Sequence, residues 1–298
     1  MASTLSAGAV AITPTGIDVV TPSGSANQPG QPYTDDLFLD AMIFDDVTFA
    51  TSDSFRPLQD FQVIDGRENI NAEWGDNDTS ADGDANPFEK AGLDSALQET
   101  TQPDIQDQIL LQSFASRSLT EMTDGESGTF AYRALFSASL RDNEAGLDGV
   151  PELIFFERGM NDLFDVALIL GGDLANPVLS AALRISSRDF WDTGIDVDTM
   201  EIGGGQSLGV GAYDIDAWGV EEGAAVYGLE LTRVSGGPDM AGFFLTAEDP
   251  ERFSDPLQPP RFAPTAVPLP PSLLLFAASL LGMSWFVARR PLQTGQRC

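Results

Sequence analysis

The stretch AVYGLELTRVSGGPD, residues 225–239, indicates the fold class of this chain. Leu229 and Leu231 alternate with Glu230 and Thr232, which is the period-two pattern of a strand that is buried on one face. Gly, Pro and Asp follow within residues 235–239, and these residue types favour a turn. We therefore expect a strand over 225–234, then a turn, and a second strand that completes a hairpin.

Runs of the same kind recur along the chain and are separated by Gly, Asn, Asp and Pro. The expected strands are MIFDDVTFA (42–50), GTFAYRALFSASL (128–140), ELIFFER (152–158), FDVALIL (164–170), LSAALRIS (179–186), SLGVGAYDIDAWG (207–219), AVYGLELTRV (225–234) and MAGFFLTA (240–247). Helices are expected only over 88–98 and 103–123. The pattern predicts a mainly β fold, an antiparallel β-sandwich of the jelly-roll type.

The chain is strongly acidic, with 46 Asp and Glu against 15 Lys and Arg and a formal net charge of −31. Such a surface repels phosphate backbones, so we expect no nucleic-acid partner. Histidine is absent, and the single cysteine, Cys298, is the last residue. These two facts exclude imidazole-based catalysis, His/Cys zinc sites and disulfides within the chain.

The segment VPLPPSLLLFAASLLGMSWFVARR, residues 267–290, contains an uncharged apolar run, 273–288. As a helix this run would be about 24 Å long, slightly less than a hydrocarbon core of roughly 30 Å. Arg289 and Arg290 can extend its reach by snorkelling, and the positive-inside rule places them in the cytoplasm. A buried core helix is the alternative, although only two serines interrupt the run.

In order, spacing and composition, this segment resembles the VPLPA-CTERM tail, a variant of the PEP-CTERM sorting signal that exosortases recognise in Gram-negative bacteria. The resemblance rests on Val267-Pro268-Leu269-Pro270, the apolar run with Gly282, and Arg289-Arg290. Pro271 stands where the pattern has Ala, and residues 291–298 follow as a cytoplasmic tail. The resemblance implies a protein that is exported, held in the inner membrane as an intermediate, and then transferred by exosortase to the cell surface or extracellular matrix.

The N-terminal residues 1–11 read as the end of a secretory signal, because Ala9-Val10-Ala11 fits an A-x-A cleavage site. A basic region is missing before this site, so we expect the front of the signal to be encoded upstream of Met1; an ordinary N-terminal extension is the alternative. Export is required before exosortase sorting, so the two ends agree. Between them we expect an extended leader over 12–34, a β-sandwich domain over 35–250 and a Pro-rich linker over 251–266.

The segment DTSADGDANPFE, residues 78–89, has the oxygen-ligand spacing of a twelve-residue calcium loop. It resembles the EF-hand loop and related loops of extracellular modules, with Gly83 at the sharp turn, Asn86 able to hold a water, and Ala85 as a departure. The expected ligands are Asp78, Ser80, Asp82, Asp84 and Glu89. A solvated acidic turn without a cation is the alternative.

Three further groups of acidic residues are candidates. The segment 141–149 is expected to be a hairpin loop, with a second cation site as the alternative. Glu152 and Glu157 flank LIFF and are expected to point to opposite faces as solvated strand ends rather than to act as a glycosidase pair. Asp214 and Asp216 are expected to share one face of a strand.

Three functional hypotheses follow. The first is a non-catalytic exported surface or matrix protein that an exosortase sorts and that associates with extracellular polysaccharide. The second is a calcium-dependent carbohydrate-binding module, in which Trp191 or Trp218 stacks on a sugar ring unless it packs in the core. The third, a secreted hydrolase that uses carboxylates alone, is the least favoured, and we expect no enzymatic activity.

Overall fold

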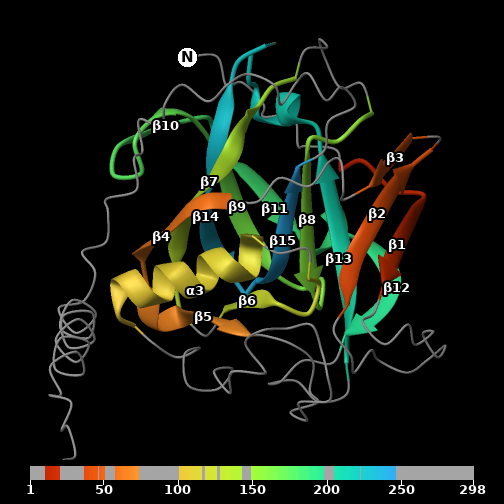
Figure 1. The fold of residues 1–298 in the computed structure, drawn as a ribbon, viewed down its shortest axis with the longest axis horizontal. Coiled ribbons are helices and arrows are strands. Elements are labelled where there is room, and N and C mark those ends of the chain that lie inside the picture. Colours follow the sequence, from red (N-terminus) through yellow and green to blue (C-terminus); the bar gives the residue numbers. More distant parts are fainter. Residues whose placement is uncertain are drawn as a thin grey trace, which may run out of the picture. The chain divides into compact units, whose positions relative to one another are not determined.

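The computed structural model describes residues 11–20, 37–45, 47–50, 58–73, 101–115, 118–125, 128–142, 149–197, 205–221 and 223–245. These residues form antiparallel sheets in a mainly β structure, as the sequence predicts (Figure 1). All of them belong to the first of two compact units, Met1–Leu257 and Gln258–Cys298. In this described part no helix has both the length and the hydropathy of a membrane span. The expected tail, 267–290, and the expected helix over 88–98 lie outside the described residues.

The described residues form two six-stranded sheets and one three-stranded sheet. Sheet I has the order β10 (Pro177–Leu179), β9 (Leu163–Gly172), β14 (Val226–Ser235), β7 (Ala131–Leu140) and β4 (Leu58–Asp65), and β11 (Leu183–Ser186) also pairs with β9. Sheet II has the order β12 (Trp191–Val197), β13 (Gln206–Tyr213), β8 (Leu153–Arg158), β15 (Asp239–Leu245), β6 (Met122–Gly125) and β5 (Ile70–Glu73). Sheet III has the order β1 (Gly16–Val20), β2 (Phe38–Phe44) and β3 (Val47–Ala50).

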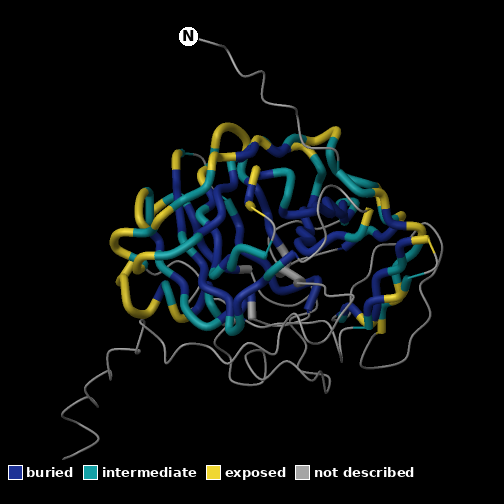
Figure 2. Tube along the Cα trace, turned by 90° about the horizontal axis from the view of Figure 1, so that it is seen from above, coloured by how far each residue is buried: buried dark blue, intermediate teal, exposed yellow. Residues whose placement is uncertain are grey.

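The main core lies between sheets I and II, where Leu229 and Leu231 of β14 belong to the same buried cluster as side chains from β8 and β13. Glu230 lies between these two leucines on the opposite face of β14 and forms an ion pair with Arg133 of the neighbouring strand β7, 2.7 Å away. The period-two pattern of this strand is therefore confirmed. Figure 2 shows the buried residues concentrated inside the body and the exposed ones at its turns.

A second core lies on the other face of sheet II, which sheet III covers. Ile154 and Phe156 of β8 belong to this second core, together with Met42 and Phe44 of β2, whereas Phe155 belongs to the main core. Because β8 is buried on both faces, it is apolar at successive positions rather than alternating. Strand β1 of sheet III is formed by residues of the expected leader, 12–34.

Helix α3 (Pro103–Ala115) packs against β4 at the edge of sheet I and against β5 and β6 at the edge of sheet II. The short 3-10 helix η1 (Arg67–Asn69) joins β4 to β5, and α3 binds this corner. Gln106 donates to the carbonyls of Arg67 and Ile70 at 2.8 and 2.7 Å, and Asp107 pairs with the Arg67 guanidinium at 2.7 Å. Helix α3 therefore fastens the corner at which the chain passes from sheet I to sheet II.

Several predicted elements have different bounds in the structure. The run 42–50 is two strands rather than one, because the chain turns at Asp45, whose φ of 50° ends β2. The run 179–186 is likewise divided, between β10 and β11. The helix predicted over 103–123 ends at Ala115, and Met122 begins β6. The strand predicted over 207–219 ends at Tyr213, and the 3-10 helix η4 (Ile215–Trp218) follows.

Both predicted hairpins are wrong, because their strands lie in different sheets. β14 belongs to sheet I and β15 to sheet II, so residues 236–238 form a crossover between the sheets. The segment 141–149 likewise connects β7 of sheet I to β8 of sheet II. Turn residues predict a change of direction, but they do not say which strand the chain will pair with next.

Candidate functional site

The predicted calcium loop lies outside the described residues. Its expected ligands are Asp78, Ser80, Asp82, Asp84 and Glu89, and no fact of the structure bears on them. The calcium site at residues 78–89 therefore stays a prediction.

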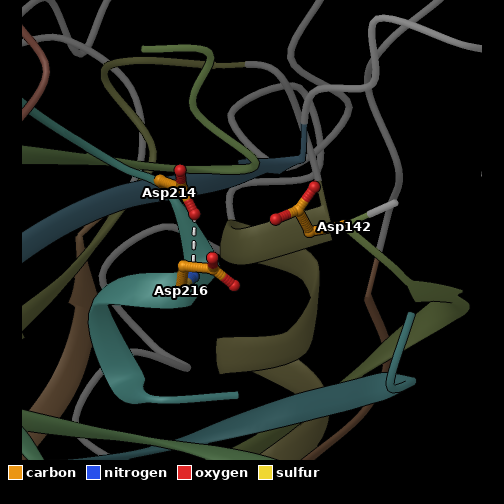
Figure 3. A group of neighbouring side chains, drawn as sticks. All are labelled: Asp142, Asp214 and Asp216. Atoms are coloured by element: carbon orange, nitrogen blue, oxygen red, sulfur yellow. Dashed lines mark hydrogen bonds between the residues drawn. The ribbon is translucent and has the colours of Figure 1, made fainter. Parts of the chain in front are cut away.

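A different acidic group comes together within the described part of the chain. Asp142 follows β7, Asp214 follows β13, and Asp216 lies in η4. Each contributes a carboxylate oxygen, and these oxygens all lie within 4.8 Å of one another. Figure 3 shows the Asp142 carboxylate approaching the other two from a separate segment of the chain.

The backbone around η4 holds two of these carboxylates in place. Asp214 is the N-cap of η4, and its Oδ1 accepts a hydrogen bond from the Asp216 amide at 2.7 Å (Figure 3). The helix ends at Gly219, whose φ of 68° is one that glycine adopts without strain. Trp218 is buried and donates its indole N–H to the Val166 carbonyl of β9 at 2.7 Å, so η4 is attached to sheet I.

Hydrogen bonds also hold Asp142 and the neighbouring Glu152 in place. The Asp142 carbonyl accepts from the Gly223 amide at 2.7 Å, and the Arg141 guanidinium donates to the Gly223 carbonyl at 2.9 Å. Glu152 accepts from the Ile215 amide at 3.2 Å and is only 1% exposed. Four acidic residues therefore surround the start of η4, and Asp142 and Asp214 are both buried.

Carboxylate oxygens are the ligands that hard divalent cations such as calcium prefer. Binding a cation of this kind is the chemistry that Asp142, Asp214 and Asp216 can offer. The same side chains and their backbone also hold η4 and the turn at Gly223, so the group has a structural role without a cation.

The sequence indicated these acidic residues separately, but it did not predict that they lie together. It placed Asp142 in a hairpin loop with a cation site as an alternative, and it placed Asp214 and Asp216 on a strand. The spacing Asp-x-Asp at residues 214–216 is that of a side chain capping the amide two residues on, which could have indicated the short helix. The approach of Asp142 depends on the packing of the two sheets and has no local signal.

The expectation that Glu152 and Glu157 are solvated strand ends is wrong. Both are buried, and Glu157 is 0% exposed. They lie at opposite ends of β8, about 16 Å apart along an extended strand, which is farther than the carboxylates of a glycosidase pair. Burial and the neighbouring Asp162 raise the pKa of Glu157 to about 10, so this carboxyl group is neutral at pH 7.

The two candidate sugar-stacking residues have different positions. Trp218 is 4% exposed within the main core, so its ring is not available to a sugar. Trp191 is half-buried and packs against the second core.

Neither a comparison with models of known protein families nor one with curated proteins finds a match to this chain.

Proposed function

We propose that this protein is an exported, non-catalytic cell-surface or extracellular-matrix protein that an exosortase sorts and that associates with extracellular polysaccharide or biofilm. The observation that carries the proposal is the C-terminal segment 267–290, with its Val-Pro-Leu-Pro start, apolar run and Arg289-Arg290 end. The apolar run, residues 273–288, is proposed to cross the inner membrane until the tail is removed.

The body supports this proposal in two ways. The compact unit that contains every described residue ends at Leu257, within the expected Pro-rich linker and before the tail begins. A strong negative charge favours solubility once the protein is released from the membrane. We further propose a jelly-roll-like sandwich, because β7, β8 and β9, and again β13, β14 and β15, alternate between sheets II and I.

The proposal is tested in a Gram-negative host that carries an exosortase and in the same strain without the exosortase gene. Mass spectrometry of protein released from the first strain is expected to find the body but no peptide from Leu273 onward. The released form would lose three arginines and keep 12 basic against 46 acidic residues. In the second strain the chain is expected to stay in the membrane fraction with its tail.

Two variants sharpen this test. Replacing residues 267–270 with alanines is expected to abolish release, whereas the matched change of Pro259 and Pro260 to alanine in the linker is expected to leave it intact. Extracellular protein that still contains Cys298, in amounts independent of the exosortase, would refute the proposal.

A calcium-dependent carbohydrate-binding module is the second candidate. It is favoured by the ligand spacing of residues 78–89 and by the proximity of Asp142, Asp214 and Asp216. Binding of the purified chain to a glycan array in millimolar calcium, and its loss in chelator, would support this candidate. Glycan binding that is equal in calcium and in chelator would show that the binding does not depend on calcium.

A further inference from the structure

Two crossovers between sheets I and II lie beside each other in the structure. One joins β8 to β9 through residues 159–162, and the other joins β14 to β15 through residues 236–238. They are in direct contact, because the Asp162 Oδ1 accepts a hydrogen bond from the Gly237 amide at 2.9 Å. This contact helps to hold the two sheets together.

The first residue of β15, directly after the second crossover, is bound to two other strands of sheet II. Asp239 accepts from the Gly125 amide of β6 at 3.2 Å and from the Arg158 guanidinium of β8 at 2.9 Å. The backbones of Gly125 and Gly237 approach so closely that a Cβ atom on either residue would collide with the other. Residues 236–238 therefore have little freedom to move while these bonds are intact.

Glu157 lies next to this pair of crossovers. It stands in register with Met240 of β15 and Gly209 of β13, and Met240 belongs to the main core, so the Glu157 side chain is on the inner face of sheet II. Asp162, at the end of the first crossover, lies close enough to raise the pKa of the Glu157 carboxyl group. Within the described part of the chain, no donor forms a hydrogen bond of good geometry with either of its oxygens, although the Met160 amide lies close enough to favour its ionised form.

The nearby guanidinium of Arg158 does not neutralise Glu157. Arg158 is the next residue on β8, so its side chain lies on the opposite face of the sheet. There it pairs with Asp239 at 2.9 Å and with Asp124 at 3.7 Å. Glu157 and Asp162 would therefore face each other as two buried like charges if both were ionised, which is strongly unfavourable.

We propose that Glu157 and Asp162 share one proton and that this proton fastens the two crossovers together. Glu157 carries the proton and donates it to a carboxylate oxygen of Asp162, which still accepts from the Gly237 amide. When hydroxide removes the proton, two facing carboxylates remain, and their repulsion pushes Asp162 and residues 236–238 away from β8. The sandwich then opens at this place in alkaline solution.

The charged and polar groups around Glu157 support this direction. Burial is the main cause that raises the pKa of Glu157 to about 10, and Asp162 and Asp239 raise it further. The Met160 amide opposes them by favouring the ionised form. The group thus keeps its proton at neutral pH and loses it only in alkaline solution.

Methyl NMR of the full chain labelled with [methyl-¹³C]methionine tests the proposal without relying on exchangeable protons. Met240 is adjacent to Glu157 in the sheet, Met160 lies in the first crossover, and Met42 lies in the second core as an internal control. Between pH 6 and pH 11, the Met160 and Met240 signals are expected to shift together with one midpoint near pH 10. The Met42 signal is expected to stay unchanged through this transition.

Three variants separate the pair from other alkaline effects. Glu157→Gln keeps an N–H donor toward Asp162 but cannot ionise, so the shared transition is expected to vanish. Asp162→Asn removes the facing charge, so the midpoint is expected to fall. Asp165→Asn, on the outer face of β9 beside Arg184, is the matched control and is expected to leave the midpoint unchanged.

The wild-type titration alone can overturn the proposal, whether or not the variants fold. No transition at Met160 and Met240, a midpoint below pH 6, or an equal shift of Met42 would each do so. If the transition persists in Glu157→Gln, a group other than Glu157 causes it, and the proposal is wrong.

Discussion

Glu157 is buried on the inner face of sheet II, so its ionisation affects the stability of the fold directly. Its pKa is about 10 in the folded chain against 4.5 for an ordinary glutamate. A group with a raised folded pKa stabilises the fold fully below its unfolded pKa, and this contribution is lost as the pH rises toward the folded pKa. Stability is therefore expected to fall between pH 4.5 and pH 10.

The change Glu157→Gln removes this pH dependence. Relative to the wild type, the variant is expected to gain stability with rising pH, by up to about 1.4 kcal/mol per pH unit. Urea unfolding at pH 5, 7 and 9 measures the difference. Glu221→Gln, at an exposed position, is the control and should show no such slope. An equal effect of Glu157→Gln at all three pH values would contradict the expectation.

A substitution of Trp218 tests whether its hydrogen bond to β9 holds η4 against sheet I. Trp218→Phe keeps an aromatic ring in the core but removes the indole N–H that donates to the Val166 carbonyl. A buried carbonyl without its donor costs about 1–3 kcal/mol, and this loss in the free energy of unfolding is the expected result. Trp191→Phe, at a half-buried position, should cost less. If the order of the two losses were reversed, η4 would not depend on this bond.

At the scale of elements, the corner between β4 and β5 is held by a side chain from a distant helix. Gln106 of α3 is buried and donates to two backbone carbonyls of this corner. Gln106→Ala is expected to destabilise the fold by about 1–3 kcal/mol, because both carbonyls lose their donor. Gln62→Ala on β4, whose side chain is only half-buried, is expected to stay within about 0.5 kcal/mol of the wild type. Urea unfolding of both variants provides the comparison.

The elements also show what the sequence could and could not predict. β7, β8, β9 and β14 were predicted near their observed bounds, because they carry long runs of apolar residues. β4, β5, β6 and β12 were missed, because polar residues interrupt them and β5 and β6 have four residues each. Their conformation depends on pairing with strands that are distant in sequence, and no local pattern reports that pairing.

The candidate site was predictable to a similar degree. Asp214 and Asp216 were identified as neighbours from their spacing alone. Asp142 joins them only because β7 ends where β13 ends, and β7 and β13 belong to different sheets. The burial of Glu152 and Glu157 was likewise not predictable, because it depends on segments distant in sequence or turned back by the fold, such as Ile215 of η4 beside Glu152 and Asp162 beside Glu157.

At the scale of the whole molecule, the chain carries a formal net charge of −31, so its carboxylates repel one another. A bound cation would relieve part of this repulsion. If a site binds calcium with a dissociation constant tenfold below the calcium concentration, mass action adds roughly 1.4 kcal/mol of stability. The melting temperature is therefore expected to be higher in millimolar calcium than in chelator.

Two variants locate the calcium effect. Asp82→Ala removes an expected ligand of the loop 78–89, and Asp214→Ala removes a member of the acidic group beside η4. The quantity to compare is the shift of melting temperature that calcium causes in each variant, because Asp214→Ala also removes a helix cap. Loss of the shift in Asp82→Ala alone would support the loop. A shift that is absent from the wild type would leave both groups as solvated or structural acids.

The position of sheet III determines how much of the chain must be synthesised before this sheet can pack. Met42 and Phe44 are synthesised early, but they are buried against β8 and β13, and β13 ends at residue 213. The N-terminal sheet must therefore wait, with its apolar side uncovered, until most of the body has been made. Contacts between segments so distant in sequence slow folding. Until then the apolar residues of sheet III stay exposed, and such exposure favours aggregation of the unfinished chain.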